Sequence, residues 1–218
     1  IVASQHRARG GWRYTPGIGS DTSVSGWMVM ALRSAELANL EVSASVWDGV
    51  NRWLELAQAS RKQSERYRYN PFAPNTPAQA HGREPSQTMT AVGLLMRMYT
   101  GWRRDHPAMV RGADYLSQRL PEIGSPTDPQ RDTYYWYYAT QVMFHMRGDY
   151  WERWQGQLHP LLVSSQELEG PLAGSWDPDL PITDRWAPYG GRLYVTTLNL
   201  LSLEVYYRHL PIYEDTAR

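Results

Sequence analysis

IVASQHRARGGW, residues 1–12, contains a short phrase that the chain uses again: an aliphatic residue, a Gln four positions later, and a Gly-x-Trp beyond it. In this first copy the phrase consists of Ile1, Gln5, Gly10 and Trp12. A second full copy near the end consists of Leu162, Gln166, Gly174 and Trp176. Leu54 with Gln58 repeats the first half, and Leu116 with Leu120 is a degraded repeat. Repetition at roughly 45 to 65 residues indicates that one supersecondary unit is used several times.

Apolar segments recur in step with this phrase. If Val24, Met89, Tyr138 and Val195 are taken as equivalent starts, the segments are separated by 65, 49 and 57 residues. A helix that is apolar around most of its circumference is normally buried on several sides. We therefore predict four inner helices, which cover roughly residues 24–32, 89–95, 138–144 and 195–201.

Amphipathic segments lie between the apolar ones. They predict outer helices over roughly 45–60, 107–120 and 150–166, with Pro107 in the first turn, where proline is tolerated. Residues 1–9 are interpreted as the tail of a further outer helix. The predicted fold class is therefore all-α, an alternation of inner and outer helices in about four helical hairpins.

The phrase carries a family resemblance. Gly49-x3-Trp53-Leu54-x3-Gln58 resembles the front of the QW motif of the squalene cyclases, and Arg111-Gly112-x2-Tyr115-Leu116 resembles the same front half. The copies at 1–12 and 162–176 resemble its back half, with one and four extra residues before the Gly. This terpene cyclase-like repeat, also named the prenyltransferase and squalene oxidase repeat, implies an α/α toroid. In the family, the Gln ties an outer helix to the next inner helix, and the Trp stacks over that junction.

The catalytic acid of the resembling family is not reproduced. Cyclases of this class share Asp-x-Asp-Asp-Thr-Ala, in which the middle Asp protonates an alkene or an epoxide. The matching stretch here is Ile18-Gly19-Ser20-Asp21-Thr22-Ser23, in which only the last Asp and the Thr remain. Ser20 cannot replace a carboxylic acid. Asp21 and Asp132 are thus weak catalytic candidates, and Asp21 is also interpreted as a helix N-cap.

Composition excludes several classes of site and partner. The chain has no Cys, so the zinc-thiolate site that resembling prenyltransferases use is absent, and the six His show no metal-ligand spacing. We expect no metal and no cofactor. Lys plus Arg equals Asp plus Glu at 22 each, so nucleic acid is not an expected partner. The longest apolar runs are far shorter than the roughly 20 residues of a membrane span. The cellular location cannot be read from the sequence.

Two aromatic clusters are the candidate binding sites. The first precedes an inner helix and the second precedes the last one; their selected residues are Tyr134, Tyr135, Trp136, Tyr137 and Gln141, and Trp186, Tyr189 and Arg192. Successive helical residues point about 100° apart, so we expect some rings of the first cluster to line a surface or a cavity. The alternative is that they pack between helices or cover loops.

Three aspartates adjoin the second cluster. Asp177, Asp179 and Asp184 could act as paired carboxylates in glycan or lipid chemistry. Beside prolines they are also typical turn residues.

Two functions follow from the sequence. One is a toroid domain without cyclase activity, a binding or scaffold module of a larger protein, with an isoprenoid, glycan or peptide ligand in the ring mouth. The alternative is a divergent enzyme on the same scaffold, either a terpene cyclase or a polysaccharide-active α/α-barrel enzyme. We expect one domain over residues 1–218, cut from a longer chain. Its open arc would be capped by the rest of that parent protein or by a second copy.

Overall fold

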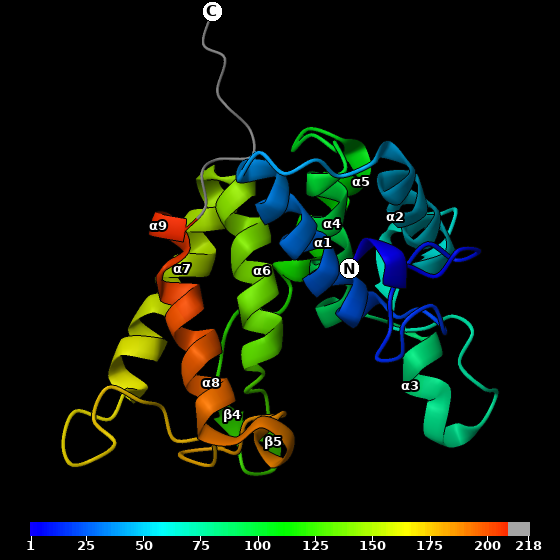
Figure 1. Cartoon of the computed structure of the whole chain (residues 1–218). Helices are drawn as coiled ribbons and strands as arrows, with labels where there is room; N and C mark the ends of the chain where they lie inside the picture. Colours follow the sequence, from blue (N-terminus) through cyan, green and yellow to red (C-terminus); the bar gives the residue numbers. More distant parts are fainter. Residues whose placement is uncertain (209–218) are drawn as a thin grey trace, which may run out of the picture. The chain divides into compact units, whose positions relative to one another are not determined.

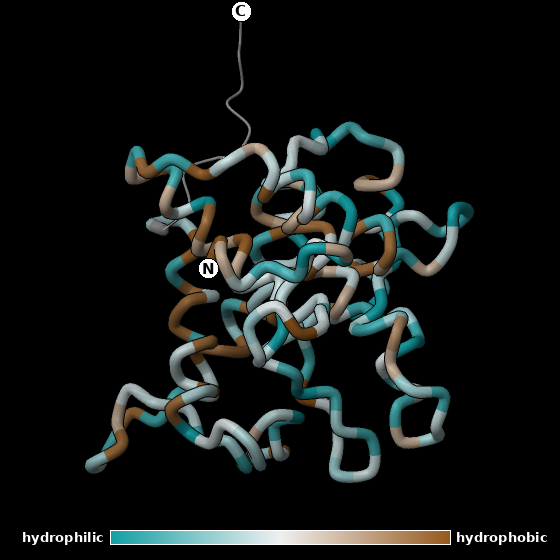
Figure 2. The backbone as a smooth tube through the Cα atoms, turned by 45° about the vertical axis from the view of Figure 1, so that its right-hand side comes forward, coloured by the Kyte–Doolittle hydropathy of each residue, from teal (hydrophilic) through white to brown (hydrophobic). Residues whose placement is uncertain are grey.

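The computed structural model describes residues 1–208 and is mainly helical (Figure 1). The chain folds into two compact units, residues 1–112 and residues 113–218. Each unit has a core of its own, and the prediction of one domain over the whole chain stays a prediction. Figure 2 shows hydrophobic residues recurring within the helices, while the connecting loops are predominantly hydrophilic.

The four segments predicted as inner helices are all helical, and α1 and α8 are less buried than predicted. They are α1 (Thr22–Leu37), α4 (Gln87–Tyr99), α6 (Thr133–Met146) and α8 (Ala187–Leu203). The start of α6 lies five residues before the predicted Tyr138, so the run of aromatic residues lies inside the helix and does not lead into it. The reason is Asp132, whose side chain accepts a hydrogen bond from the backbone of Tyr135 and so begins the helix earlier.

The three predicted outer helices are also present. They are α2 (Ala44–Ala57), α5 (Pro107–Leu116) and α7 (Gly148–Ser165). Shorter helical segments are η1 (Val2–Ser4), η2 (Pro77–Gln79), α3 (Ala80–Arg83) and α9 (Val205–Arg208). Residues 1–9 do not form the predicted helix tail, because beyond η1 they turn back through hydrogen bonds such as that from Gly10 N to His6 O.

Unit 1 is built on the pairing of α1 with α4. The sheet strand β2 (Gln63–Arg68) packs on α4 as well, and α2 contacts both helices and β2. Trp12, Trp53 and Tyr67 supply the largest buried side chains of this core. Tyr67 reaches α4 because Gly93 leaves room for its ring.

Two small antiparallel sheets correct the all-α prediction. In unit 1, β1 (Gln58–Ser60), β2 and β3 (Pro85–Ser86) form one sheet, in which Tyr67 pairs with both Gln58 and Ser86. In unit 2, β4 (Gly124–Ser125) and β5 (Asp128–Pro129) form a short hairpin. Both sheets lie in connections that the sequence predicted as loops or helix ends, since strands of two to six residues carry little periodic signal.

Unit 2 is built around α6, which packs against α7 and α8. The interface of α6 with α7 contains a buried hydrogen bond from Trp154 Nε1 to Thr140 Oγ1, 2.9 Å long. Tyr135 and Trp154 meet edge to face, with ring centroids 5.7 Å apart. These interactions make α6 the most completely buried helix of the unit.

A kink divides α8 into two parts. Gly191 has φ 59° and ψ −160°, a backbone conformation that interrupts the helix and that side chains other than glycine rarely adopt. The turn 187–190 therefore stands apart from the regular part, 192–203. The kink gives the two parts different exposed surfaces.

We predict that Gly93→Ala lowers the free energy of unfolding by about 1–3 kcal/mol, because its Cβ would lie 2.4 Å from Cγ of Tyr67. Gly156→Ala in α7 is the matched control, since nothing lies within 4 Å of its Cβ position, and alanine there should stabilise by about 0.5–1 kcal/mol. Urea unfolding of both variants measures the difference. Equal stability of the two would contradict the packing of Tyr67 over α4.

Candidate functional site

Both full copies of the sequence phrase make the same side-chain hydrogen bond. Gln5 Nε2 donates to the carbonyl oxygen of Gly10 at 2.7 Å, and Gln166 Nε2 donates to that of Gly174 at 2.9 Å. Both glycines have positive φ, at 79° and 85°. In each unit, the Gln side-chain amide therefore closes the loop by binding the carbonyl oxygen of a glycine with positive φ.

The tryptophans of the two copies also make matching hydrogen bonds. The indole Nε1 of Trp12 donates to Ile1 O, and that of Trp176 donates to Leu162 O, both at 2.9 Å. The backbone N–H of Trp12 donates to Ser25 Oγ in α1, and that of Trp176 to Thr196 Oγ1 in α8. Each Trp thus joins the start of the phrase to an inner helix, which is a structural role.

Gln5 also reaches the next outer helix. Its Nε2 donates a second hydrogen bond to Val46 O of α2, 3.0 Å away. Gly49 of α2 allows this approach, because a Cβ there would lie 2.5 Å from the same nitrogen. The Gln of one copy therefore packs against the glycine that opens the next copy of the motif.

The two incomplete copies use other aromatic residues, which sequence reasoning missed. Tyr67 N donates to Thr90 Oγ1 of α4, the bond that Trp12 makes to Ser25. The hydroxyl of Tyr135 donates to Leu116 O at 3.0 Å, as the indoles do to Ile1 O and Leu162 O. For Tyr135 the available signal was an aromatic residue at the start of an apolar segment, whereas Tyr67 lies 20 residues before α4 and had no such local signal.

The two catalytic candidates both cap inner helices. Asp21 Oδ1 accepts from Val24 N at 2.8 Å, and Asp132 Oδ1 accepts from Tyr135 N at 3.0 Å. Both side chains are buried. Burial raises the pKa of Asp21, while the bond from Val24, Tyr69 and Arg13 act in the opposite direction.

Asp184 joins the α6 cap from a distant loop. Its Oδ2 accepts from Thr133 N and its Oδ1 from Trp186 N, both at 2.9 Å. Burial raises the pKa of Asp184, and the nearby charge of Asp132 adds to that rise, while Arg131 opposes it. The α6 N-terminus is therefore held by two buried carboxylates, 52 positions apart in the chain.

The other two loop aspartates behave as turn residues. Asp177 Oδ1 accepts from the backbone N–H groups of Asp179 and Leu180, at 2.8 and 3.1 Å. These bonds and an ion pair lower the pKa of Asp177. The cation of that pair is Arg192, which also binds Glu167, each at 2.6 Å. Arg192, predicted as a binding residue, is thus engaged within its own unit.

The first aromatic cluster is buried. Tyr134, Tyr135, Trp136 and Tyr137 are exposed by 5%, 0%, 2% and 1%. The part of the expectation that placed some of these rings on the surface is therefore wrong, because α6 packs against α7, α8 and α9 and this part of it is buried. Gln141 is buried too, and its Nε2 donates to Tyr137 O one turn earlier.

The second aromatic cluster remains accessible. Tyr189 is 85% exposed, Trp186 is partly exposed, and the Arg185 side chain is 61% exposed. Trp186 is oriented by a hydrogen bond from its Nε1 to Asp132 Oδ1, 3.1 Å, and Arg185 lies 5.7 Å from its ring centroid. We name Arg185, Trp186 and Tyr189 the aromatic rim. The caps of α6 and the rim are one cluster, buried at one end and open at the other.

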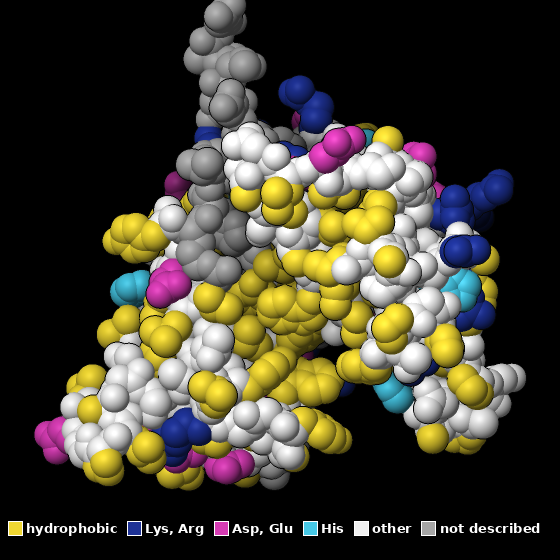
Figure 3. All heavy atoms as spheres, in the orientation of Figure 1, with side chains coloured by type: hydrophobic (Ala, Val, Ile, Leu, Met, Phe, Trp, Pro, Cys, Tyr) yellow, Lys and Arg dark blue, Asp and Glu magenta, His cyan; other side chains and the backbone are white. Residues whose placement is uncertain are grey.

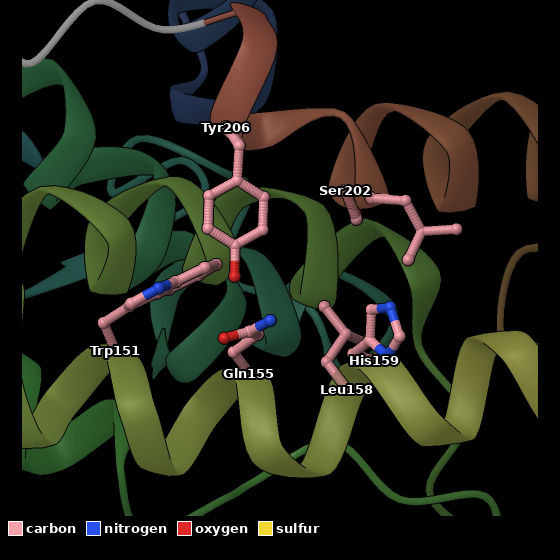
Figure 4. A pocket seen from close by; sticks show the side chains of 7 residues that line it. Trp151, Gln155, Leu158, His159, Ser202 and Tyr206 are labelled. Atoms are coloured by element: carbon pink, nitrogen blue, oxygen red, sulfur yellow. The ribbon is translucent and has the colours of Figure 1, made fainter.

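A shallow cleft lies elsewhere in unit 2 (Figure 4). It offers about 220 Å³ of space open to solvent and is lined by Trp151, Gln155, Leu158, His159, Ser202, Leu203 and Tyr206. Figure 4 shows the Tyr206 hydroxyl directed toward Trp151 and Gln155. Only about 10 Å³ of this space is enclosed, room for about one water molecule, whereas ordinary small-molecule sites occupy about 300–1,000 Å³.

Comparison with known proteins returned no match to any family model, curated protein or solved structure. Within the described chain, no three His, Cys, Asp or Glu side chains are grouped so that they could hold a metal ion. Among residues 1–208, none of the helices combines the length and apolar character that a bilayer crossing requires. A proposal about the function therefore rests on the geometry of the α6 caps and the aromatic rim.

We predict a pH-dependent effect of Asp184→Asn. Since the pKa of Asp184 is raised in the folded state, its protonated form stabilises the fold below the ordinary value of 3.8, and that stabilisation is lost as pH rises through the folded-state pKa. Each unit of pKa difference corresponds to about 1.4 kcal/mol. The free energy of unfolding of the wild type minus that of the variant should therefore decrease with rising pH.

Urea unfolding between about pH 3.5 and 7 measures this difference. Asp179→Asn, an exposed aspartate of the same loop, is the control and should leave the pH profile near that of the wild type. A parallel pH profile for Asp184→Asn and the wild type would show that Asp184 carries no such coupling.

Proposed function

We propose that this chain is a squalene cyclase-like repeat domain of the α/α-toroid kind that binds a partner and does not catalyse cyclisation. The toroid is supported by the alternation of apolar and amphipathic helices, and by the hydrogen bonds that its two full motif copies share. These bonds use the Gln and Trp of the motif entirely for the scaffold. The domain then keeps the architecture of the family without its chemistry.

The observation that carries the proposal is the engagement of the carboxylates. Asp21 and Asp132 each accept a hydrogen bond from the backbone of an inner-helix first turn. Alkene protonation requires an unusually strong acid, whereas burial raises the pKa of Asp21 and makes it a weaker one. The neighbouring Ser20 has no acidic proton to add.

The aromatic rim is the proposed contact with the partner. Tyr189 and Trp186 offer ring surfaces, and Arg185 adds a cation beside them. An isoprenoid chain on so exposed a surface would leave most of its apolar area in water. A glycan or a peptide has polar groups that stay hydrated while one face stacks on the rings. We therefore favour a glycan or a peptide as the ligand.

A second candidate is a divergent glycan-active enzyme. It is favoured by the proximity of the rim to two buried aspartates, of which Asp184 has a raised pKa, as a general acid would. Against it, both oxygens of Asp184 accept backbone hydrogen bonds. An enzyme would release reducing sugar from a bound glycan, and a binding module would not.

Incubation with squalene and shorter polyprenyl substrates should give no cyclised product by gas chromatography with mass spectrometry. Asp21→Asn should keep the fold because Asn is an equally good N-cap, while Asp21→Ala should lose about 1 kcal/mol. A cyclised product that disappears in Asp21→Asn would contradict the proposal and establish Asp21 as the acid.

Tyr189→Ala should weaken binding to the best ligand from an oligosaccharide array or a short-peptide array. A lost aromatic contact of about 0.5–1.5 kcal/mol corresponds to roughly a 2- to 10-fold higher Kd. Tyr14→Ala is the control, because Tyr14 is 80% exposed but lies in unit 1. Isothermal titration calorimetry measures both variants. Equal affinity of both variants would show that the aromatic rim is not part of the binding site.

A further inference from the structure

The even charge of the whole chain conceals two oppositely charged units. Residues 1–112 contain 14 Lys and Arg against 8 Asp and Glu, a formal charge of +6, whereas residues 113–218 contain 8 against 14, a formal charge of −6. In Figure 3, Lys and Arg side chains gather at the edge of unit 1 where Figure 1 shows α2 and the N-terminal segment. An excess of one charge on one surface indicates a partner of the opposite charge.

Arginines at the start of the chain supply part of this excess, because the first acidic residue is Asp21. Arg7 is exposed, and Arg52 of α2 lies beside it, donating a hydrogen bond to the Arg7 carbonyl oxygen at 3.1 Å. Among the described residues, no carboxylate forms an ion pair with Arg7, Arg9 or Arg52. Arg13 is 41% exposed and lies 3.6 Å from the buried carboxylate of Asp21. These guanidinium groups can therefore interact with an external anion.

A short hairpin, residues 13–19, carries exposed apolar side chains in the same segment. A backbone bridge between Thr15 and Ile18 closes a tight turn, in which Gly17 has φ 70°. The hairpin leaves Tyr14 80% and Ile18 68% exposed. Apolar groups that stand out on a turn gain free energy when a partner removes them from water.

The hairpin and the arginines contact the same stretch of unit 1, residues 69–72. The side chain of Tyr14 contacts that of Tyr69, and the guanidinium of Arg9 lies 4.1 Å from the centroid of the Phe72 ring. Phe72 is itself 45% exposed. Cationic and apolar groups are thus neighbours on this part of unit 1. We name it the basic surface, and it consists of Arg7, Arg9, Arg13, Tyr14, Ile18, Arg52 and Phe72.

This combination of groups fits an anionic lipid surface. Arginines bind the head groups of anionic lipids, and tyrosine and isoleucine side chains can enter the interfacial layer of a bilayer. A nucleic acid would also bind the arginines, but its phosphates would leave Ile18 in water, and groove recognition uses a helix or a β-ribbon. The basic surface consists of loops, one turn and one residue of α2.

We propose that the basic surface binds reversibly to membranes that contain anionic lipid, with Tyr14 and Ile18 entering the head-group layer. Both signals are needed, because a few cations or a few apolar side chains alone bind a bilayer only weakly. The proposed surface lies in unit 1, so it does not depend on the aromatic rim of unit 2.

Co-sedimentation of the full chain with lipid vesicles tests the electrostatic part. The protein should bind vesicles of phosphatidylserine mixed with phosphatidylcholine, should bind less as NaCl is raised, and should not bind phosphatidylcholine alone. Arg7→Gln should weaken binding about 5-fold, since one arginine near an anionic surface contributes about 1 kcal/mol. Arg153→Gln, which removes an exposed arginine of α7 in unit 2, is the matched control and should bind like the wild type.

Single-cysteine variants test the insertion of the hairpin, since the chain has no Cys of its own. Ile18→Cys labelled with an environment-sensitive fluorophore should shift its emission to the blue on phosphatidylserine vesicles. Leu168→Cys is the matched control, because Leu168 is 78% exposed in unit 2, and its label should not shift. Absence of binding, equal binding of Arg7→Gln and the wild type, or an unshifted label at residue 18 would each overturn the proposal. So would displacement of the vesicles by a DNA duplex that binds more tightly, which would assign the arginines to nucleic acid.

Discussion

The structure depends on the acceptors that close the first turns of its inner helices. The backbone N–H groups of a helix start have no partner inside the helix and must find one elsewhere. Asp21, Ser86 and Asp132 supply that partner for α1, α4 and α6. Two of these caps also pair through the backbone with the aromatic residue before them, Asp21 with Trp12 and Ser86 with Tyr67. The cap, the aromatic residue and the helix are therefore one structural device.

In the cyclase-like domain that we propose, this device lets the scaffold form without the cyclase acid. The position that matches the proton-donating Asp of a cyclase is Ser20, and the next residue, Asp21, supplies the hydrogen-bond acceptor that the cap requires. Asp132 and Asp184 both accept hydrogen bonds from the first turn of α6. Asp132 also accepts a hydrogen bond from Trp186 and so orients that ring. At Asp21, Asp132 and Asp184, at least one carboxylate oxygen accepts a hydrogen bond that a helix start requires.

The helices could be predicted from the sequence because their signals are local. Recurring apolar segments identified α1, α4, α6 and α8, and the amphipathic segments identified the outer helices. Strand β2 was missed because residues 63–68, QSERYR, are mostly polar, and its partner β3 follows after 16 intervening residues. The burial of Tyr134 to Tyr137 and the second cap from Asp184 depend on interactions between distant segments, which a local pattern does not contain.

Three carbonyl groups at equivalent places in the repeat receive a side-chain hydrogen bond from different residue types. Ile1 O and Leu162 O receive it from a tryptophan, and Leu116 O receives it from Tyr135, which lies within a helix instead of a loop. The full sequence motif occurs twice, whereas the hydrogen bond to the carbonyl group occurs three times. The repeat is therefore better defined by this hydrogen bond than by residue type, because tryptophan and tyrosine both make it.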